Sequence, residues 1–191
     1  MKKILFFASG TGSNVENIIQ YFTESTSILI VGIFTNNPMA KVLDKAHKYN
    51  ISTLIFNWEQ LYEGFVLKKI AELDPDLIVL AGFLWKFPKH IIAAYPKKVI
   101  NIHPALLPKY GGKGMYGIKV HQTVLDNQEK ETGITIHYVN EHYDEGEFIF
   151  QQKVNVIDCA SADEIAAKIQ KLEHKYFPKI IEVLLTQNAK L

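Results

Sequence analysis

Arginine is absent from this sequence of 191 residues, so all 21 of its basic side chains are lysines. Lysine cannot make the planar, two-pronged hydrogen bonds that a guanidinium gives to carboxylates, phosphates and guanine. The formal net charge is only +1, which is not the strongly basic character of a nucleic-acid-binding domain. We therefore expect small-molecule ligands and no nucleic acid, with anions bound by backbone N–H groups, helix N-termini or lysine.

Cysteine and long apolar runs are also scarce. Cys159 is the only cysteine, which excludes an intramolecular disulfide bond and a zinc site built from several cysteines. The apolar run at residues 4–8 is shorter than the core of a signal peptide, and no run approaches the roughly 20 residues that span a bilayer. No His-x-x-x-His or His/Cys cluster indicates a metal site. We expect a cytoplasmic monomer or homodimer without bound metal or membrane contact.

The first half of the sequence alternates between strand-like and helix-like patterns. Short apolar or β-branched runs predict strands at residues 4–8, 28–35, 52–56, 77–81 and 99–103. Helix-forming patterns lie between them, at residues 14–22, 41–48, 61–73 and 88–94. Repeated strand–helix units predict an α/β, Rossmann-like fold, with a mostly parallel twisted sheet and helices on both faces.

The pattern changes after residue 103. Residues 104–117 contain two prolines and four glycines, and they predict a long mobile loop that closes over a ligand. Residues 133–139 and 148–156 predict paired strands, the antiparallel C-terminal portion of the sheet. Ser161 and Glu164 fit a capping box before a long helix. The expected buried stripe of that helix is Ile165, Ile169, Leu172, Tyr176, Ile180 and Leu184. Because no linker or repeat is visible, we expect one domain over residues 1–191.

A glycine-rich turn connects the first predicted strand to the first predicted helix, and it contains Gly12, Ser13 and Asn14. The free N–H groups and the dipole of a helix N-terminus favour an anion such as phosphate. Val15 stands where the third glycine of the dinucleotide fingerprint is expected. The pattern therefore favours a phosphomonoester over a dinucleotide, with a plain turn and its capping residues as the alternative.

Asn101 and His103 lie at the end of a predicted parallel strand, where α/β sheets bind their ligands. The period of two residues puts both side chains on one face of the strand. An asparagine amide donates to an oxyanion, and a histidine can both donate and transfer a proton. The pair suits a tetrahedral intermediate of acyl transfer. By geometry alone, a hydrogen-bonded pair with a purely structural role is an equal alternative.

Four separated motifs together narrow the interpretation. The longest is residues 101–112, Asn-Ile-His-Pro-Ala-Leu-Leu-Pro-Lys-Tyr-Gly-Gly. The others are Asp144-Glu145-Gly146, Gly12-Ser13-Asn14 and Gln170-x-x-Glu173-His174. In this combination the chain resembles the 10-formyltetrahydrofolate-dependent formyltransferases, and the resemblance covers nearly its whole length.

The resemblance implies direct transfer of the formyl group from N10 of 10-formyltetrahydrofolate to the amine of glycinamide ribonucleotide, a step of purine synthesis. Asn101 and His103 would stabilise the oxyanion of the tetrahedral intermediate. Asp144 would keep His103 protonated and help to relay protons, because a neighbouring carboxylate raises the pKa of a histidine. Taken alone, Asp144 is better explained as a turn acid before Gly146.

The same resemblance assigns the ribonucleotide site. Gly12, Ser13 and Asn14 would cradle the ribose phosphate, and Glu173 would contact the ribose hydroxyls or the region of the amine. For Glu173 the alternative is a solvated carboxylate on a helix, the usual state of such residues.

The resemblance also implies a folate site after the fourth predicted strand. The expected contacts are Leu84, Trp85, Lys86, Phe87, Asn101, Asn140, Glu141, His142 and Tyr143. Several relatives carry an arginine where this chain has Trp85 and Lys86. The tryptophan can stack on the folate, and the lysine can meet its glutamate tail as a point charge. Without the resemblance, residues 84–87 are a strand-to-helix connection with aromatic core anchors.

Two other classes of function stay open on the sequence. One is a formyltransferase for another amine, either methionyl-tRNA or a nucleotide-linked amino sugar; a tRNA enzyme is expected to carry a further C-terminal domain and a basic surface. The other is a non-enzymatic nucleotide- or folate-binding module. Among the other histidines, we expect His121 to help order the loop, His137 to be structural and His142 to line the pocket.

Overall fold

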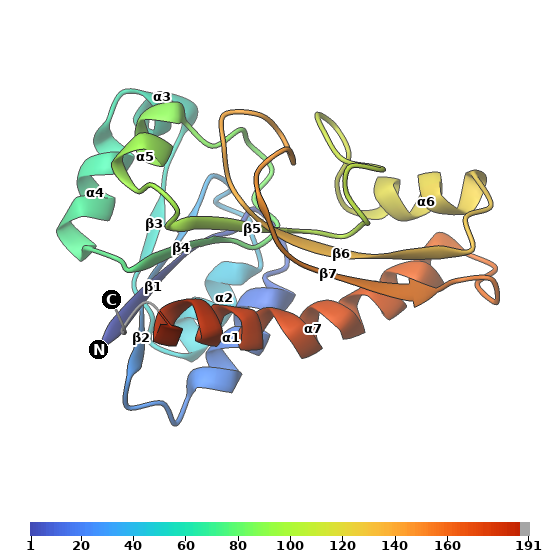
Figure 1. The fold of residues 1–191 in the computed structure, drawn as a ribbon. Helices are drawn as coiled ribbons and strands as arrows, with labels where there is room; N and C mark the ends of the chain where they lie inside the picture. Colours follow the sequence, from blue (N-terminus) through green and yellow to red (C-terminus); the bar gives the residue numbers. More distant parts are fainter. Residues whose placement is uncertain (188–191) are drawn as a thin grey trace.

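A seven-stranded sheet forms the centre of the protein in the computed structural model, which describes residues 1–187 (Figure 1). The strand order is β3-β2-β1-β4-β5-β6-β7. The strands are β1 (Lys2–Phe7), β2 (Ile28–Thr35), β3 (Thr53–Ile55), β4 (Leu77–Leu80), β5 (Val99–His103), β6 (Glu131–Tyr138) and β7 (Phe148–Asn155). Strands β1 to β5 are parallel, whereas β6 and β7 are antiparallel. The predicted parallel sheet with an antiparallel C-terminal portion is confirmed.

Helices cover both faces of the sheet, as predicted (Figure 1). They are α1 (Ser13–Phe22), α2 (Val42–Lys48), α3 (Trp58–Tyr62), α4 (Phe65–Leu73), α5 (Lys89–Ala94), α6 (Ile118–Asp126) and α7 (Ala162–Gln187). Helices α3, α4 and α5 lie on one face, and α1, α2 and α7 lie on the other. Helix α6 packs against α7. The core is therefore divided by the sheet into two layers.

Strand β1 shows how this layering follows from the sequence. Ile4 and Phe6 point into the layer with α1 and α7, while Leu5 and Phe7 point into the layer with α3 to α5. All four side chains are fully buried. A strand covered on both faces has no solvent side, which is why its sequence is an uninterrupted apolar run.

Two helices were predicted incorrectly. Residues 61–73 do not form one helix, because Gly64 adopts a left-handed conformation (φ 94°) that ends α3 and precedes α4. Helix α6 was not predicted at all. Its buried face carries only Val120, His121 and Val124, so the apolar period is weak.

The start of α7 is close to the prediction, but its buried face is different. The Ser161 hydroxyl accepts a hydrogen bond from the Glu164 N–H (3.3 Å). The Glu164 carboxylate accepts from the N–H of Ala160 and not from the N–H of Ser161, which a capping box requires. Ile165 and Ile169 are buried as predicted. Further along, the buried residues are Phe177, Ile181 and Leu185, whereas the predicted Leu172, Tyr176, Ile180 and Leu184 are only partly buried.

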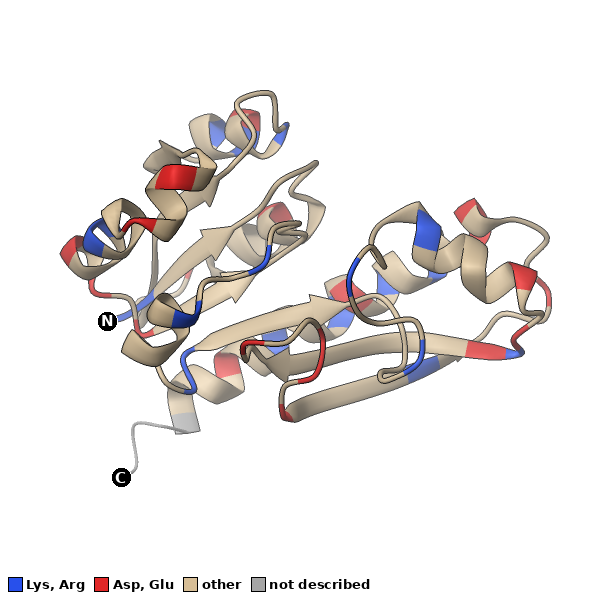
Figure 2. Cartoon of the chain, turned by 90° about the horizontal axis from the view of Figure 1, so that it is seen from above, with Lys and Arg blue, Asp and Glu red and all other residues tan. Residues whose placement is uncertain are grey.

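Charged side chains are distributed without one dominant sign. Lysines and acidic residues are interspersed along the helices and loops (Figure 2). Within residues 1–187, no helix combines the length and the apolar character needed to cross a membrane.

The carboxyl ends of β1, β4 and β5 meet at one edge of the sheet. After β1 the chain forms β2 on one side of β1, and it later returns to form β4 on the other side of β1. The direction in which strands are added therefore reverses between β1 and β4, which is a topological switch point. Ser9 connects the loops after these two strands: its N–H donates to the Gly82 carbonyl, and its hydroxyl accepts from the Leu84 N–H, both at 3.0 Å. The loops that carry the sequence motifs are thereby brought together.

Candidate functional site

A cavity of about 810 Å³ opens at this edge of the sheet. Its walls come from residues within six segments of the chain: 10–14, 80–87, 101–104, 112–121, 137–144 and 163–173. The four motifs of the sequence each contribute to the wall. The fold therefore gathers residues from both halves of the chain around one space.

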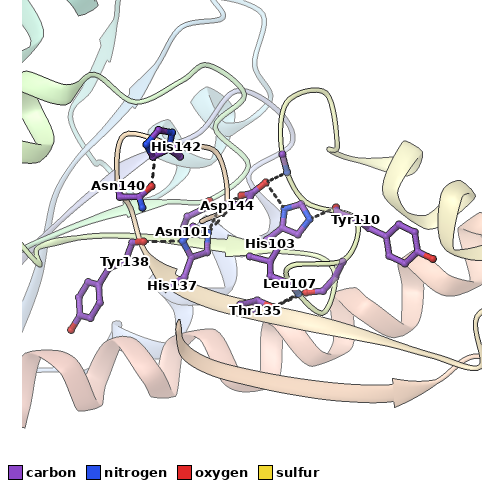
Figure 3. A network of polar contacts seen from close by, with 12 residues as sticks. Asn101, His103, Leu107, Tyr110, Thr135, His137, Tyr138, Asn140, His142 and Asp144 are labelled. Carbon is purple, nitrogen blue, oxygen red and sulfur yellow. Dashed lines mark hydrogen bonds and ion pairs between the residues drawn. The ribbon is translucent and has the colours of Figure 1, made fainter. Parts of the chain in front are cut away.

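His103 is almost completely enclosed, with only 4% of its surface exposed. Its Nε2 lies 2.7 Å from the carbonyl oxygen of Tyr110, and its Nδ1 lies 3.4 Å from Oδ2 of Asp144 (Figure 3). The predicted partnership of His103 and Asp144 is therefore a direct contact.

The charge state of His103 is set by opposing effects. Burial lowers its pKa and is the largest effect, while the Asp144 carboxylate and the Tyr110 carbonyl raise it. His137 lowers it further, and the net pKa is below the ordinary value. The expectation that Asp144 keeps His103 protonated accounts for the effect of the carboxylate but not for the effect of burial, which no sequence pattern reports.

Asp144 is held in place by the loop opposite to it. Its backbone adopts a left-handed conformation (φ 57°), and its Oδ2 accepts the N–H of Gly112 at 2.9 Å. Burial raises the pKa of the carboxyl, but contacts with His137, His103 and the Gly112 N–H outweigh burial and keep the pKa below its usual value. Asp144 is thus a carboxylate at neutral pH and not merely a turn residue.

Asn101 connects Asp144 to a second histidine, His137 (Figure 3). The Asn101 amide nitrogen lies 3.1 Å from Nε2 of His137 and 3.4 Å from Oδ1 of Asp144. Nδ1 of His137 donates to the Tyr138 carbonyl (2.9 Å), so in a neutral ring Nε2 accepts from Asn101. The sequence interpretation treated His137 as structural and missed this network. No local sequence signal reveals this contact, since His137 on β6 meets Asn101 only as its antiparallel partner on β5.

The predicted anion site lies at the start of α1. Gly12 has φ 68°, and a Cβ there would collide with the Val42 side chain, so only glycine fits. No side chain of the described chain caps the first turn of α1. Gly12, Ser13 and Asn14 line the cavity, with the N-terminal end of the helix dipole.

Glu173 joins this turn from the far end of the sequence. Its carboxylate accepts from the Asn14 amide at 2.9 Å, although the two residues are 159 positions apart. Burial raises the pKa of Glu173 to about 7, and the hydrogen bond from Asn14 only partly offsets this. Oδ1 of Asn14 is buried and has no hydrogen-bond partner within residues 1–187. Glu173 is therefore not the solvated helix carboxylate that its sequence position alone suggested.

The raised pKa of Glu173 predicts a pH-dependent loss of stability. A glutamate ionises near pH 4.5 in the unfolded chain but near pH 7 here, so the folded state is increasingly destabilised between those pH values. Above pH 7 the loss is roughly 3 kcal/mol, at about 1.4 kcal/mol per pH unit. We expect Glu173→Gln to raise the free energy of unfolding at pH 8 but hardly at pH 5, as measured by urea denaturation. An equal gain at both pH values would contradict this origin.

The segment after β4 forms a different wall of the cavity. Leu84, Trp85, Lys86 and Phe87 all line it, although Phe87 is almost completely buried. The Tyr62 hydroxyl donates to the Lys86 carbonyl at 2.8 Å and fixes this segment against α3. An aromatic and aliphatic wall with one lysine suits a flat heterocycle that carries a carboxylate.

The loop before Asp144 contributes to the wall in part. Asn140, His142 and Tyr143, three of the expected folate contacts, line the cavity. Glu141 does not line it and instead pairs with Lys89 at 2.8 Å. The prediction of Glu141 as a binding residue is therefore not supported by its position. His121, on α6, is buried and reaches the same cavity.

The described residues contain no group of three His, Cys, Asp or Glu side chains placed to hold a metal ion. The polar chemistry of the cavity is instead that of one imidazole beside a carboxylate, an amide and a second imidazole. This set can stabilise a developing oxyanion and move a proton.

Comparison with known proteins agrees with this geometry. A family model described as formyl transferase matches residues 2–181. Phosphoribosylglycinamide formyltransferase of Bacillus subtilis is 33% identical, over 98% of this chain and 97% of its own length. The protein of that name from Escherichia coli is 34% identical, over 93% and 84% of the two chains. The chain spans 67% and 61% of the chloroplast proteins of that name from Arabidopsis thaliana and Vigna unguiculata.

Solved structures give the same result. The phosphoribosylglycinamide formyltransferase from Anaplasma phagocytophilum superposes with a TM-score of 0.88 at 31% identity, over 97% of this chain and 87% of that chain. The one from Brucella melitensis has a TM-score of 0.84 at 33% identity, over 94% and 93%.

Proposed function

The chain belongs to the formyl transferase family, and from that premise we propose that it transfers the formyl group of 10-formyltetrahydrofolate to the amine of glycinamide ribonucleotide. The observation that carries the proposal is the Asn101–His103–Asp144 network. It lies on the cavity wall, in the same space as the anion-binding turn of α1 and the aromatic segment after β4. Both substrates can therefore meet at the network.

The chemistry follows from what these side chains can donate. The substrate amine attacks the formyl carbon, a C–N bond forms, and the carbonyl oxygen becomes an oxyanion. The Asn101 amide and the His103 imidazolium donate to that oxyanion. The bond from carbon to folate N10 then breaks, and one proton moves from the amine to N10. Asp144, as a carboxylate beside His103, supports the imidazolium and relays the proton.

The ribonucleotide is assigned to the α1 side of the cavity. Its phosphate accepts hydrogen bonds from the N–H groups of Gly12, Ser13 and Asn14. The dipole of α1 makes this position favourable for an anion. Without arginine in the chain, backbone donors carry this contact. Glu173 is placed beside Asn14 to accept from the ribose hydroxyls.

The folate is assigned to the segment after β4. Its flat ring packs along Leu84 and Trp85, with Asn140 and His142 lining the same cavity, and Lys86 meets the glutamate tail as a point charge. Tyr143 and the buried Phe87 complete the wall.

One assay tests the proposal. Purified protein is incubated with 10-formyltetrahydrofolate and glycinamide ribonucleotide, and release of tetrahydrofolate is followed with time. Parallel reactions replace the ribonucleotide by methionyl-tRNA or by a nucleotide-linked amino sugar. Turnover on either of these without turnover on the ribonucleotide would overturn the proposed substrate. Binding of both ligands without any turnover would favour a non-enzymatic module.

The anion site gives a prediction of its own. The double variant Ser13→Ala/Asn14→Ala is expected to raise KM for the ribonucleotide by about tenfold, the scale for lost hydrogen bonds to a charged group. KM for the folate is expected to change much less, because the folate is assigned to the other wall. Initial-rate kinetics with each substrate varied in turn measure both values.

A matched control is available on the same helix. Asn17 donates its amide to the His174 carbonyl and does not line the cavity. Asn17→Ala is expected to leave both KM values near those of the unaltered protein. A larger effect of the double variant on the folate than on the ribonucleotide would refute the assignment of the two walls.

A further inference from the structure

The His103 ring is held at both nitrogens, and the two contacts differ in kind. A carbonyl oxygen can only accept, so the 2.7 Å contact with Tyr110 requires a proton on Nε2. A second proton on the ring must then sit on Nδ1, 3.4 Å from Asp144. That distance is long for a hydrogen bond. The Nδ1 proton is therefore the loosely held one, and it is the proton that His103 can offer to an oxyanion.

The Tyr110 carbonyl is held in its position by an unusual backbone. Tyr110 has φ 57°, a left-handed conformation that a bulky residue rarely adopts. Such a conformation persists only where surrounding contacts hold it. The Tyr110 side chain points away from His103 (Figure 3), and its ring packs against the core.

Glu129 supplies the polar contact at the end of this side chain. The Tyr110 hydroxyl donates to Oε1 of Glu129 at 2.8 Å, and Lys109 donates to the same oxygen at 2.7 Å. Burial and Glu129 raise the pKa of Tyr110 to about 12, so its hydroxyl keeps its proton throughout the neutral range. Glu129 thus binds two successive residues of the loop outside the cavity.

The other end of the same segment is fixed as well. The Thr135 hydroxyl accepts from the Leu107 N–H at 3.0 Å, and the Gln151 amide donates to the Leu107 carbonyl at 2.9 Å. Only Pro108 and Lys109 separate Leu107 from Tyr110. With Leu107 fixed on the sheet, the contact with Glu129 determines where the Tyr110 carbonyl lies.

We propose that Glu129 is a positioning residue for formyl transfer, which holds the Tyr110 carbonyl on Nε2 of His103 and thereby leaves the working proton on Nδ1. The proposal rests on the proposed function, because it assigns a supporting role in that reaction. Glu129 touches no reacting atom and does not line the cavity.

Titratable side chains and one carbonyl, from different segments of the chain, face the His103 ring. They are Asp144 from its loop, His137 from β6, His121 from α6 and the Tyr110 carbonyl. Within residues 1–187, Glu129 makes no side-chain hydrogen bond to His121, His137 or Asp144. The Glu129 carboxylate is also not among the groups that shift the pKa of His103, so an effect of Glu129 on His103 passes through Tyr110.

The first test needs no substrate. Ring titration of His103 is followed by NMR in the full-length protein, comparing the unaltered chain with Glu129→Gln and Tyr110→Phe. Each variant is expected to lower the pKa of His103, because the carbonyl that stabilises the charged ring is no longer held. The double variant is expected to shift the titration no further than either single one. This test stands even if the proposed function fails in the activity assay.

The second test uses the pH profile of kcat. Activity that needs protonated His103 falls as pH rises through its pKa, so a lowered pKa moves this alkaline limb to lower pH. On the limb we expect kcat of Glu129→Gln to be about fivefold lower, the scale for one hydrogen bond, with KM for both substrates nearly unchanged. Glu129→Asp is expected to restore part of the loss.

Glu131→Gln is the matched control, because Glu131 also pairs with a lysine, Lys153, on the nearby sheet edge. It is expected to leave both the titration and the kcat profile unchanged. If Glu129→Gln behaves like this control, the proposal is overturned. It is equally overturned if the shifts of Glu129→Gln and Tyr110→Phe simply add, since they would then act by separate routes. Thermal unfolding identifies a variant that fails to fold, in which case Tyr110→Phe alone decides.

Discussion

Replacing His103 by alanine is expected to lower kcat by at least about 100-fold, the scale for loss of one oxyanion donor or acid–base group. In the proposed mechanism the imidazolium donates to charge that appears only in the tetrahedral intermediate, so KM for either substrate is expected to change little. Steady-state kinetics at several pH values measure both quantities. At 4% exposure the ring also fills space, so folding of the variant is checked by thermal unfolding.

His47→Ala provides the comparison. His47 is exposed on α2 and does not line the cavity, so its removal is expected to leave kcat unchanged. A near-normal kcat for His103→Ala would remove His103 from the reaction and, with it, the proposed role of Glu129. The ring titration would then describe a structural histidine only.

Replacing Asp144 by asparagine is expected to move the alkaline limb of the kcat profile to lower pH. The carboxylate of Asp144 raises the pKa of His103 against the larger, opposite effect of burial. Without that charge the pKa of His103 falls further, so the ring loses its proton at a lower pH. On the limb, kcat is expected to fall on the order of tenfold or more, as for loss of a close opposite charge. An asparagine oxygen can still accept from the Gly112 N–H, which preserves the loop contact.

Glu145→Gln removes the same charge one residue away. Glu145 is exposed and does not line the cavity, so its replacement should leave the profile in place. An unchanged profile for Asp144→Asn would count against the pairing of Asp144 with His103. A uniform loss at all pH values would instead indicate that Asp144 acts mainly in proton relay.

The site was predictable where its chemistry is local. The strand ending in Asn101 and His103 and the turn at Gly12 are each recognisable within a few residues as candidate sites, because strand period and helix-start geometry are short-range properties. Asp144 could be assigned only through the resemblance to a family. Its contact with His103 joins two loops on different strands, and no local pattern encodes it.

Other members of the site were missed or misplaced for the same reason. His137 faces Asn101 only because β6 runs antiparallel beside β5. Glu141 was expected at the folate wall, but its side chain turns to Lys89 on α5. A side chain in a loop has no period that fixes its direction, whereas the alternation of a strand does.

The sequence by itself determined the alternating strands and helices, the glycine turn and the absence of guanidinium groups, and it indicated Asn101 and His103 as candidates for the reaction. Only the tertiary structure decided their charge states. Burial lowers the pKa of His103 below the level that Asp144 alone would set, and it raises the pKa of Glu173 to about 7. Burial and cross-chain contacts depend on segments that are distant in sequence, such as Asn14 and Glu173. Their energies exist only once the sheet has brought those segments together.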